Sequence, residues 1–70
     1  MDRTLVSSSN LNSVGYDSAS SVLEIEFNSG GVYQYFQVPS HVYDGLMSAS
    51  SKGSYFHQHI KESFRYKRVL

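Results

Sequence analysis

Three pairs of side chains in this 70-residue chain have types and spacings that suggest chemistry. They are Tyr33 with Tyr35, Glu24 with Glu26, and His57 with His59. Rings two residues apart on a strand lie on the same face, where they form a platform on which single-stranded bases can stack. We expect Tyr16, from a neighbouring strand, to join this aromatic platform.

The other two pairs are poor candidates for catalysis or metal binding. Residues two apart on a helix point about 200° from each other, so His57 and His59 cannot hold one ion. Glutamates on a small open sheet usually keep it soluble, and no glycine pattern of a nucleophile elbow surrounds any serine. The chain also has no cysteine. We therefore expect no enzyme activity, no metal or other cofactor, and no small-molecule substrate.

Charge is distributed unevenly along the chain, although the net charge is zero. Up to Ser51 one basic residue stands against five acidic ones, whereas from Lys52 onward five basic residues accompany only Glu62. The basic residues near the end are Lys61, Arg65, Lys67 and Arg68. Such a split indicates either a docking surface for nucleic acid or an acidic protein, or simply a solvated helix face.

Alternation of apolar and polar residues predicts three strands. Residues 22–27 place Leu23, Ile25 and Phe27 on one face and the two glutamates on the other. Residues 11–17 form an earlier strand, with Gly15 as a bulge or a point of close approach. Residues 30–39 run from a glycine pair through aromatic and β-branched residues to the only proline. The serine-rich residues before 11 are expected to be a loose arm or a short edge strand.

The loop between the second and third strands decides which way the tyrosines face. An even loop pairs Phe27 with Val32 and matches apolar with apolar residues, whereas an odd loop puts the tyrosines in the core. We choose the even loop. Tyr33 and Tyr35 then lie beside the glutamates on the face opposite the core, and the strand contributes Val32, Phe36 and Val38 to the core.

Two helices are expected after the proline. The first spans residues 41–50 with Ser40 as its N-cap, and the second spans residues 55–64 with Ser54 as its N-cap. Residues 65–70 either continue the second helix or form a short terminal strand. Strands followed by helices predict one α+β domain, with a three-stranded antiparallel sheet, a possible fourth edge strand from a terminus, and two C-terminal helices packed on one face.

The chain has no apolar run long enough for a signal peptide or for a membrane span, which takes about 18 residues. We therefore expect a cytoplasmic location and no membrane partner.

Five short segments match, in order, the pattern of a known family. They are Val6-Ser7-Ser8-Ser9, Val14-Gly15-Tyr16-Asp17, Leu23-Glu24-Ile25-Glu26-Phe27, Tyr33-Gln34-Tyr35 with Val38-Pro39, and Ser51-Lys52-Gly53-Ser54-Tyr55-Phe56 with Ile60-Lys61. In these segments the chain resembles the KTSC domain, a module found at the C-terminus of some lysyl-tRNA synthetases and as small free-standing bacterial proteins. The resemblance implies no established activity. Attachment to a tRNA-handling enzyme suggests RNA, or an RNA-associated protein, as the partner.

Two functions remain open from the sequence. The first is a small non-enzymatic binding module for RNA, in which Tyr16, Tyr33 and Tyr35 stack or dock and the four basic residues near the end attract phosphates. The glutamates expected on the tyrosine face argue against it. The second is a protein-interaction or homodimerisation domain in which another chain covers the tyrosine face.

Overall fold

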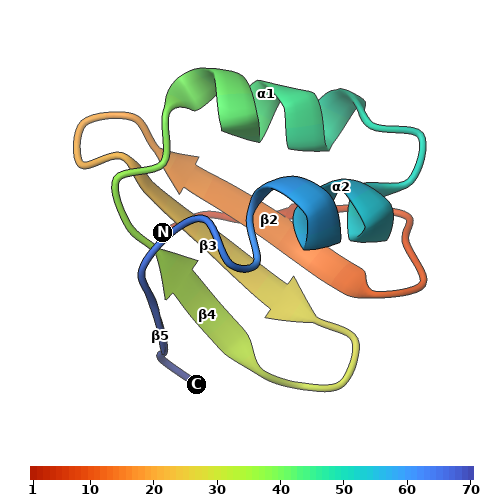
Figure 1. The fold of residues 1–70 in the computed structure, drawn as a ribbon. Helices are drawn as coiled ribbons and strands as arrows, with labels where there is room; N and C mark the ends of the chain where they lie inside the picture. The colour runs from red at the N-terminus through yellow and green to blue at the C-terminus, as the bar shows by residue number, and fades with distance from the viewer.

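The computed structural model describes all of residues 1–70 and shows a five-stranded antiparallel sheet with two helices (Figure 1). The strands lie side by side in chain order, β1-β2-β3-β4-β5. Their bounds are Thr4–Leu5 for β1, Leu11–Asp17 for β2, Val22–Phe27 for β3, Val32–Tyr35 for β4 and Tyr66–Arg68 for β5. The predicted α+β class is confirmed. The prediction of three strands with a possible fourth edge strand from one terminus falls short by one, because both ends of the chain add an edge strand.

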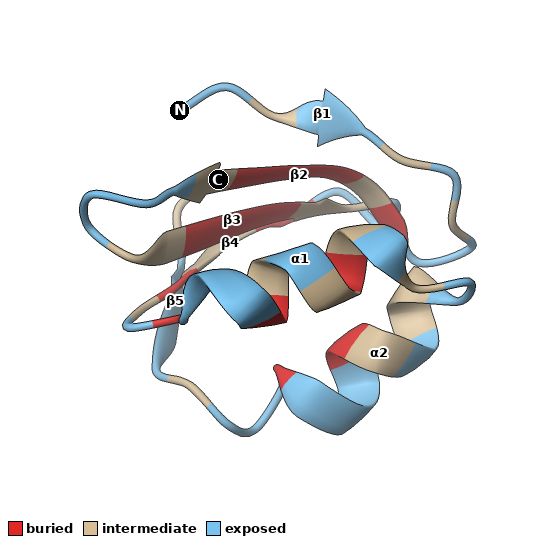
Figure 2. Cartoon of the chain, turned by 90° about the horizontal axis from the view of Figure 1, so that it is seen from above, coloured by how far each residue is buried: buried red, intermediate tan, exposed pale blue.

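The helices α1 (Ser40–Ser48) and α2 (Lys52–His59) follow β4 and lie on the same side of the sheet in Figure 2. They do not end the chain, because β5 follows them. Both predicted N-caps are wrong. Pro39 precedes α1, and α2 begins early because the hydroxyl of Ser51 accepts a hydrogen bond from the backbone N–H of Ser54 at 3.3 Å.

The first two predicted strands match β2 and β3. Gly15 is a point of close approach, since a Cβ atom there would lie 2.5 Å from the carbonyl oxygen of Asp2. The irregularity in the ladder lies between Leu11 and Ser13 and not at the glycine. The N-terminal arm therefore passes directly over β2, where only a residue without a side chain leaves room for it.

The register between β3 and β4 corrects our prediction. Glu26 pairs with Val32 and Leu23 with Tyr35, so the loop is odd. Tyr35 consequently faces the helices and is 4% exposed, while Val32 shares the other face with the glutamates and Phe36 is only half-buried. The prediction matched apolar with apolar residues across the hairpin and thereby left both tyrosines outside the core. Burying an aromatic ring removes about 150 to 250 Å² of surface from water, which is more than the side chain of Val32 can remove. The register that buries the ring of Tyr35 is therefore the more stable one.

Val32 is nevertheless buried, and the two residues that follow β5 run alongside it. The backbone N–H of Val69 donates to the carbonyl oxygen of Val32 at 2.8 Å, and the N–H of Val32 donates to the carbonyl oxygen of Leu70 at 3.3 Å. The terminal segment thus covers a residue that our choice of register had assigned to the core under the helices.

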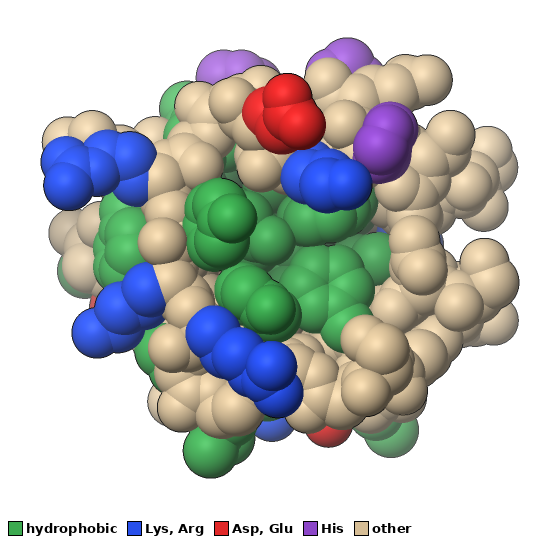
Figure 3. All heavy atoms as spheres, turned by 60° about the horizontal axis from the view of Figure 1, so that its bottom comes forward, with side chains coloured by type: hydrophobic (Ala, Val, Ile, Leu, Met, Phe, Trp, Pro, Cys, Tyr) green, Lys and Arg blue, Asp and Glu red, His purple; other side chains and the backbone are tan.

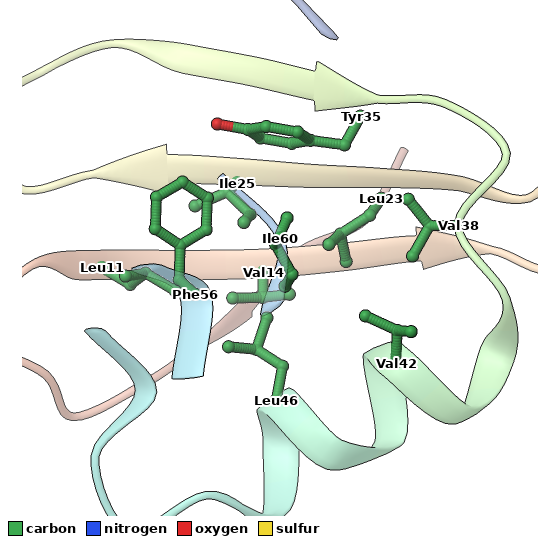
Figure 4. Packing of buried hydrophobic residues seen from close by; sticks show 10 residues of the cluster. All are labelled: Leu11, Val14, Leu23, Ile25, Tyr35, Val38, Val42, Leu46, Phe56 and Ile60. Carbon is green, nitrogen blue, oxygen red and sulfur yellow. The ribbon is translucent and has the colours of Figure 1, made fainter. Parts of the chain in front are cut away.

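The core lies between the sheet and the helices, where side chains from both layers point toward one another (Figure 4). Its ten buried residues are Leu11, Val14, Leu23, Ile25, Tyr35, Val38, Val42, Leu46, Phe56 and Ile60. Tyr35 and Phe56 lie at its edge, with ring centroids 5.6 Å apart in an edge-to-face arrangement. The aromatic edge of the core is therefore continuous with the surface beyond it.

A polar network occupies the sheet face opposite the helices. Glu24, which is 6% exposed, forms an ion pair with Arg3 and accepts a hydrogen bond from Nε2 of Gln34 at 2.8 Å. Burial would raise the pKa of Glu24, but the hydrogen bonds from Gln34 and Arg3 outweigh it and hold the pKa below its usual value. Glu26 accepts bonds from Asn12 and Ser13, both at 2.8 Å. Both glutamates are therefore engaged on the side away from the tyrosines.

Candidate nucleic-acid interface

A groove with a volume of about 430 Å³ opens where β4 and β5 meet the turn that follows α2. Its lining residues come from β3, β4, α2, β5 and that turn, and they are Phe27, Tyr33, Tyr35, Phe56, Lys61, Glu62, Phe64 and Tyr66. Figure 3 shows this face, with hydrophobic side chains gathered in its hollow and basic side chains around them. We call this feature the aromatic groove.

The rings of the aromatic groove are placed by the pairing of β5 with β4. Tyr66 pairs with Tyr35, and Arg68 pairs with Tyr33. Side chains of directly opposed residues lie on the same face, so the ring of Tyr66 lies 5.5 Å from that of Tyr35 and 6.0 Å from that of Tyr33. Tyr66 is 57% exposed, whereas Tyr35 forms the buried floor. The groove therefore has one free aromatic wall and one fixed aromatic floor.

The hydroxyl of Tyr35 has no hydrogen-bond partner within the chain, although the residue is almost completely buried. Every side-chain nitrogen or oxygen atom that is sealed from solvent has a hydrogen-bond partner. Because the hydroxyl of Tyr35 has none, solvent must reach it, and it opens into the groove that the residue lines. Burial, with smaller contributions from Tyr66 and Tyr33, raises the pKa of Tyr35 to about 12. The phenol therefore keeps its proton at neutral pH and remains able to donate as well as accept.

Cations surround this opening. The guanidinium of Arg68 lies 5.9 Å from the ring centroid of Tyr33, and its Nε donates to the carbonyl oxygen of Leu70 at 2.7 Å. Lys61 lines the groove itself. Arg65 and Lys67 line a neighbouring hollow of about 530 Å³ together with Phe36, Gln37 and Tyr66. Tyr66 borders both hollows, so they lie on either side of this residue at the sheet edge.

Six of the seven residues expected at a binding site lie around these two hollows. The exception is Tyr16, whose hydroxyl donates to the carbonyl oxygen of Val38 at 2.6 Å and whose ring stacks on Tyr43 at 4.9 Å between centroids. Tyr16 thus packs the far end of the sheet against α1. The open platform predicted for the tyrosines does not exist, because the sheet face that carries them is covered by the helices.

Sequence reasoning missed Tyr66, the most exposed ring of the site. Its signal was the option of a terminal strand over residues 65–70, in which Tyr66 would alternate with Arg65 and Lys67. His57 and His59 are exposed on α2, and nowhere do three histidine, acidic or cysteine side chains lie together in a way that could hold a metal ion.

Fold and site together define a small α+β domain with an aromatic, positively bordered groove at one sheet edge. The family model of the KTSC domain matches residues 7–64, so the chain belongs to the KTSC domain family, as its sequence motifs predicted. A crystal structure of a KTSC domain protein from Yersinia pestis superimposes with a TM-score of 0.96 at 42% identity, covering 99% of this chain and 97% of the other.

Two similar proteins differ in the share of their own length that this chain matches. An uncharacterised protein of Stutzerimonas stutzeri is 43% identical over 70 residues, which are 99% of both chains. A lysine–tRNA ligase of Trichormus variabilis is 48% identical over 54 residues, which are 77% of this chain and 10% of the ligase. The chain thus spans a tenth of the length of that ligase. Neither α1 nor α2 has the length and the apolar composition that a membrane-spanning helix needs.

Proposed function

We propose that this chain is a non-enzymatic module that binds single-stranded RNA at the aromatic groove. The observation that carries the proposal is the grouping of aromatic rings with four cations, accompanied only by the carboxylate of Glu62. Stacking of a base on an aromatic ring contributes about 1 to 3 kcal/mol, and lysine and arginine attract phosphates. The occurrence of a related segment in a lysine–tRNA ligase supports RNA as the partner class.

The register of β3 and β4 favours this function electrostatically. With the predicted register, Glu24 and Glu26 would have repelled phosphates from the tyrosine face. The observed register puts them on the opposite face, where Arg3 and Gln34 bind the first and Asn12 and Ser13 bind the second. Glu24 and Glu26 are thereby turned away from the aromatic groove and are already engaged by other side chains.

Homodimerisation through the tyrosines is the less favoured alternative. A homodimer of this kind needs a solvent-exposed sheet face that carries the tyrosines, so that a second chain can cover it. The helices of the same chain already pack on that face, and Phe56 of α2 contacts the ring of Tyr35. No second copy is needed to remove Tyr35 from water.

The test is a titration of the protein into fluorescently labelled single-stranded RNA at two salt concentrations. We expect binding that weakens with salt, with a logarithmic slope of about 0.7 per phosphate contacted. The double variant Arg65→Ala with Lys67→Ala should bind more weakly and show a smaller slope. Lys52→Ala is the matched control, because Lys52 lies at the start of α2 and its Nζ donates to the carbonyl oxygen of Ala49 at 3.2 Å, outside both hollows. No binding even at low salt would contradict the proposal.

A further inference from the structure

We infer that the aromatic groove receives a single unstacked nucleobase, whose polar edge meets the hydroxyl of Tyr35. This inference rests on the proposed function and makes it more specific. In this binding mode one base inserts into the groove, whereas on a flat platform several bases would stack in a row. Tyr35, the floor of the groove, then forms a hydrogen bond with the inserted base.

The first support is the hydroxyl of Tyr35 itself. A hydroxyl that has no partner in the chain and is reached by solvent is free to bond a ligand that displaces the water. This hydroxyl is held by a ring that is 4% exposed, has no partner in the chain, and opens into the groove. It is a donor and an acceptor set in an otherwise aromatic surface. Base edges carry the matching acceptors and donors, whereas the sugar and phosphate lack a flat apolar surface for the surrounding rings.

The second support is the shape of the groove. Its volume of about 430 Å³ lies within the range of small-ligand sites, roughly 300 to 1,000 Å³. Its rings come from several elements and stand at steep angles, with Phe27 inclined by 78° to Tyr33 and Phe56 by 77° to Tyr35. Tyr66 is inclined less steeply, by 33° to Tyr35 and by 53° to Tyr33. Walls at these mixed angles suit one flat group better than a row of parallel bases. A base inside a duplex is stacked and paired, so it cannot present its edge here.

The third support is where the charges lie. Lys61 lines the groove and Arg68 lies over Tyr33, so both are placed to meet the phosphates of a nucleotide whose base is inserted. Tyr66 separates the groove from the neighbouring hollow, which Arg65 and Lys67 line. Lys67 pairs with Gln34 and therefore points to the other face of the sheet from Tyr66. The RNA strand is expected to leave the groove past Tyr66 and to turn around the edge strand β5 toward these two side chains.

The experiment compares three RNA tetranucleotides by fluorescence anisotropy. One has four adenines, one has a single adenine with three abasic positions, and one is fully abasic. We expect the RNA with a single adenine to bind almost as tightly as the RNA with four adenines. The fully abasic RNA should bind about tenfold more weakly than the single-adenine RNA, which corresponds to the loss of one stacked base. In the protein observed by NMR, the single-adenine chain should shift the ring signals of Tyr35, Tyr66 and Phe56.

Tyr35→Phe tests the hydroxyl directly, because it removes one oxygen and keeps the ring. It should weaken binding of the single-adenine chain by about fivefold, the effect of one hydrogen bond. Tyr43→Phe is the matched control, since Tyr43 is a half-buried tyrosine of α1 outside the groove, and it should change nothing.

Two results would overturn the inference and leave the proposed function intact. One is affinity that rises equally with each added base, which indicates stacking along a surface. The other is binding of the single-adenine chain that is unaffected by Tyr35→Phe. Failure of every tetranucleotide and of longer RNA to bind at low salt would overturn both proposals.

Discussion

At the scale of single residues, Tyr16 and Tyr35 show how the same side chain takes different roles. Both rings pack against the core, but Tyr16 donates its hydroxyl to the carbonyl oxygen of Val38 and Tyr35 has no partner. Tyr16→Phe removes the hydrogen bond to the carbonyl oxygen of Val38, so it should lower the free energy of unfolding by about 1 kcal/mol. Tyr35→Phe loses no internal bond and should change it by less than about 0.5 kcal/mol. Urea denaturation followed by circular dichroism measures both, and an equal loss in the two variants would contradict these roles.

Glu24 makes the stability of the fold depend on pH. Its pKa in the folded state is held below the ordinary value of 4.5, so folding favours the ionised carboxylate. The stabilisation is therefore complete above the unfolded pKa and is lost as the pH falls through the folded pKa. We expect urea denaturation to show a lower free energy of unfolding at pH 3 than at pH 7.

Glu24→Gln should flatten part of this pH dependence. The remaining part belongs to Asp17 and Glu26, whose pKa values are also lowered, in each case chiefly by side-chain hydrogen bonds. An unchanged pH profile in Glu24→Gln would show that the ion pair with Arg3 does not couple to folding.

At the scale of elements, the approach of α1 to α2 depends on Gly45. A Cβ atom there would lie 2.2 Å from the hydroxyl oxygen of Tyr55 and 2.7 Å from the adjacent ring carbon. Gly45→Ala should therefore destabilise the protein, although alanine favours a helix by about 1 kcal/mol over glycine. In a Tyr55→Ala background the obstacle is gone, so the same substitution should stabilise by about that amount. A double-mutant cycle in urea checks the reversal of sign, and the same sign in both backgrounds would contradict it.

The edge strand β5 shows how a short element creates a site. Its three residues are all exposed, so alternation in the sequence barely signals them. The bonds between β4 and β5, together with the contacts of Tyr66 with Tyr33 and Tyr35, hold the strand in place. Without β5 the aromatic groove would lose its exposed wall and one of its cations, because Tyr66 and Arg68 both belong to this strand.

At the scale of the whole molecule, the sheet has one face covered by helices and one face carrying the polar network of Arg3, Glu24 and Gln34. Neither face presents the open row of tyrosines that self-association was expected to use. We therefore predict a monomer at micromolar concentration in sedimentation velocity. A concentration-dependent dimer that Tyr66→Ala abolishes would instead favour a protein-interaction role for the groove.

The sequence by itself determined β2, β3, the presence of two helices, and the KTSC family, because alternation, helical spacing and ordered motifs are properties of neighbouring residues. Of the seven predicted site residues, five line the two hollows and Arg68 lies over the ring of Tyr33, but the prediction placed Tyr33 and Tyr35 on the wrong face. Only the tertiary structure decided that face. A shift of one residue in the hairpin inverts every side chain, and the choice depends on what the helices and β5 can cover. The same packing brought Tyr66 to Tyr35 and left the hydroxyl of a largely buried tyrosine open to the groove.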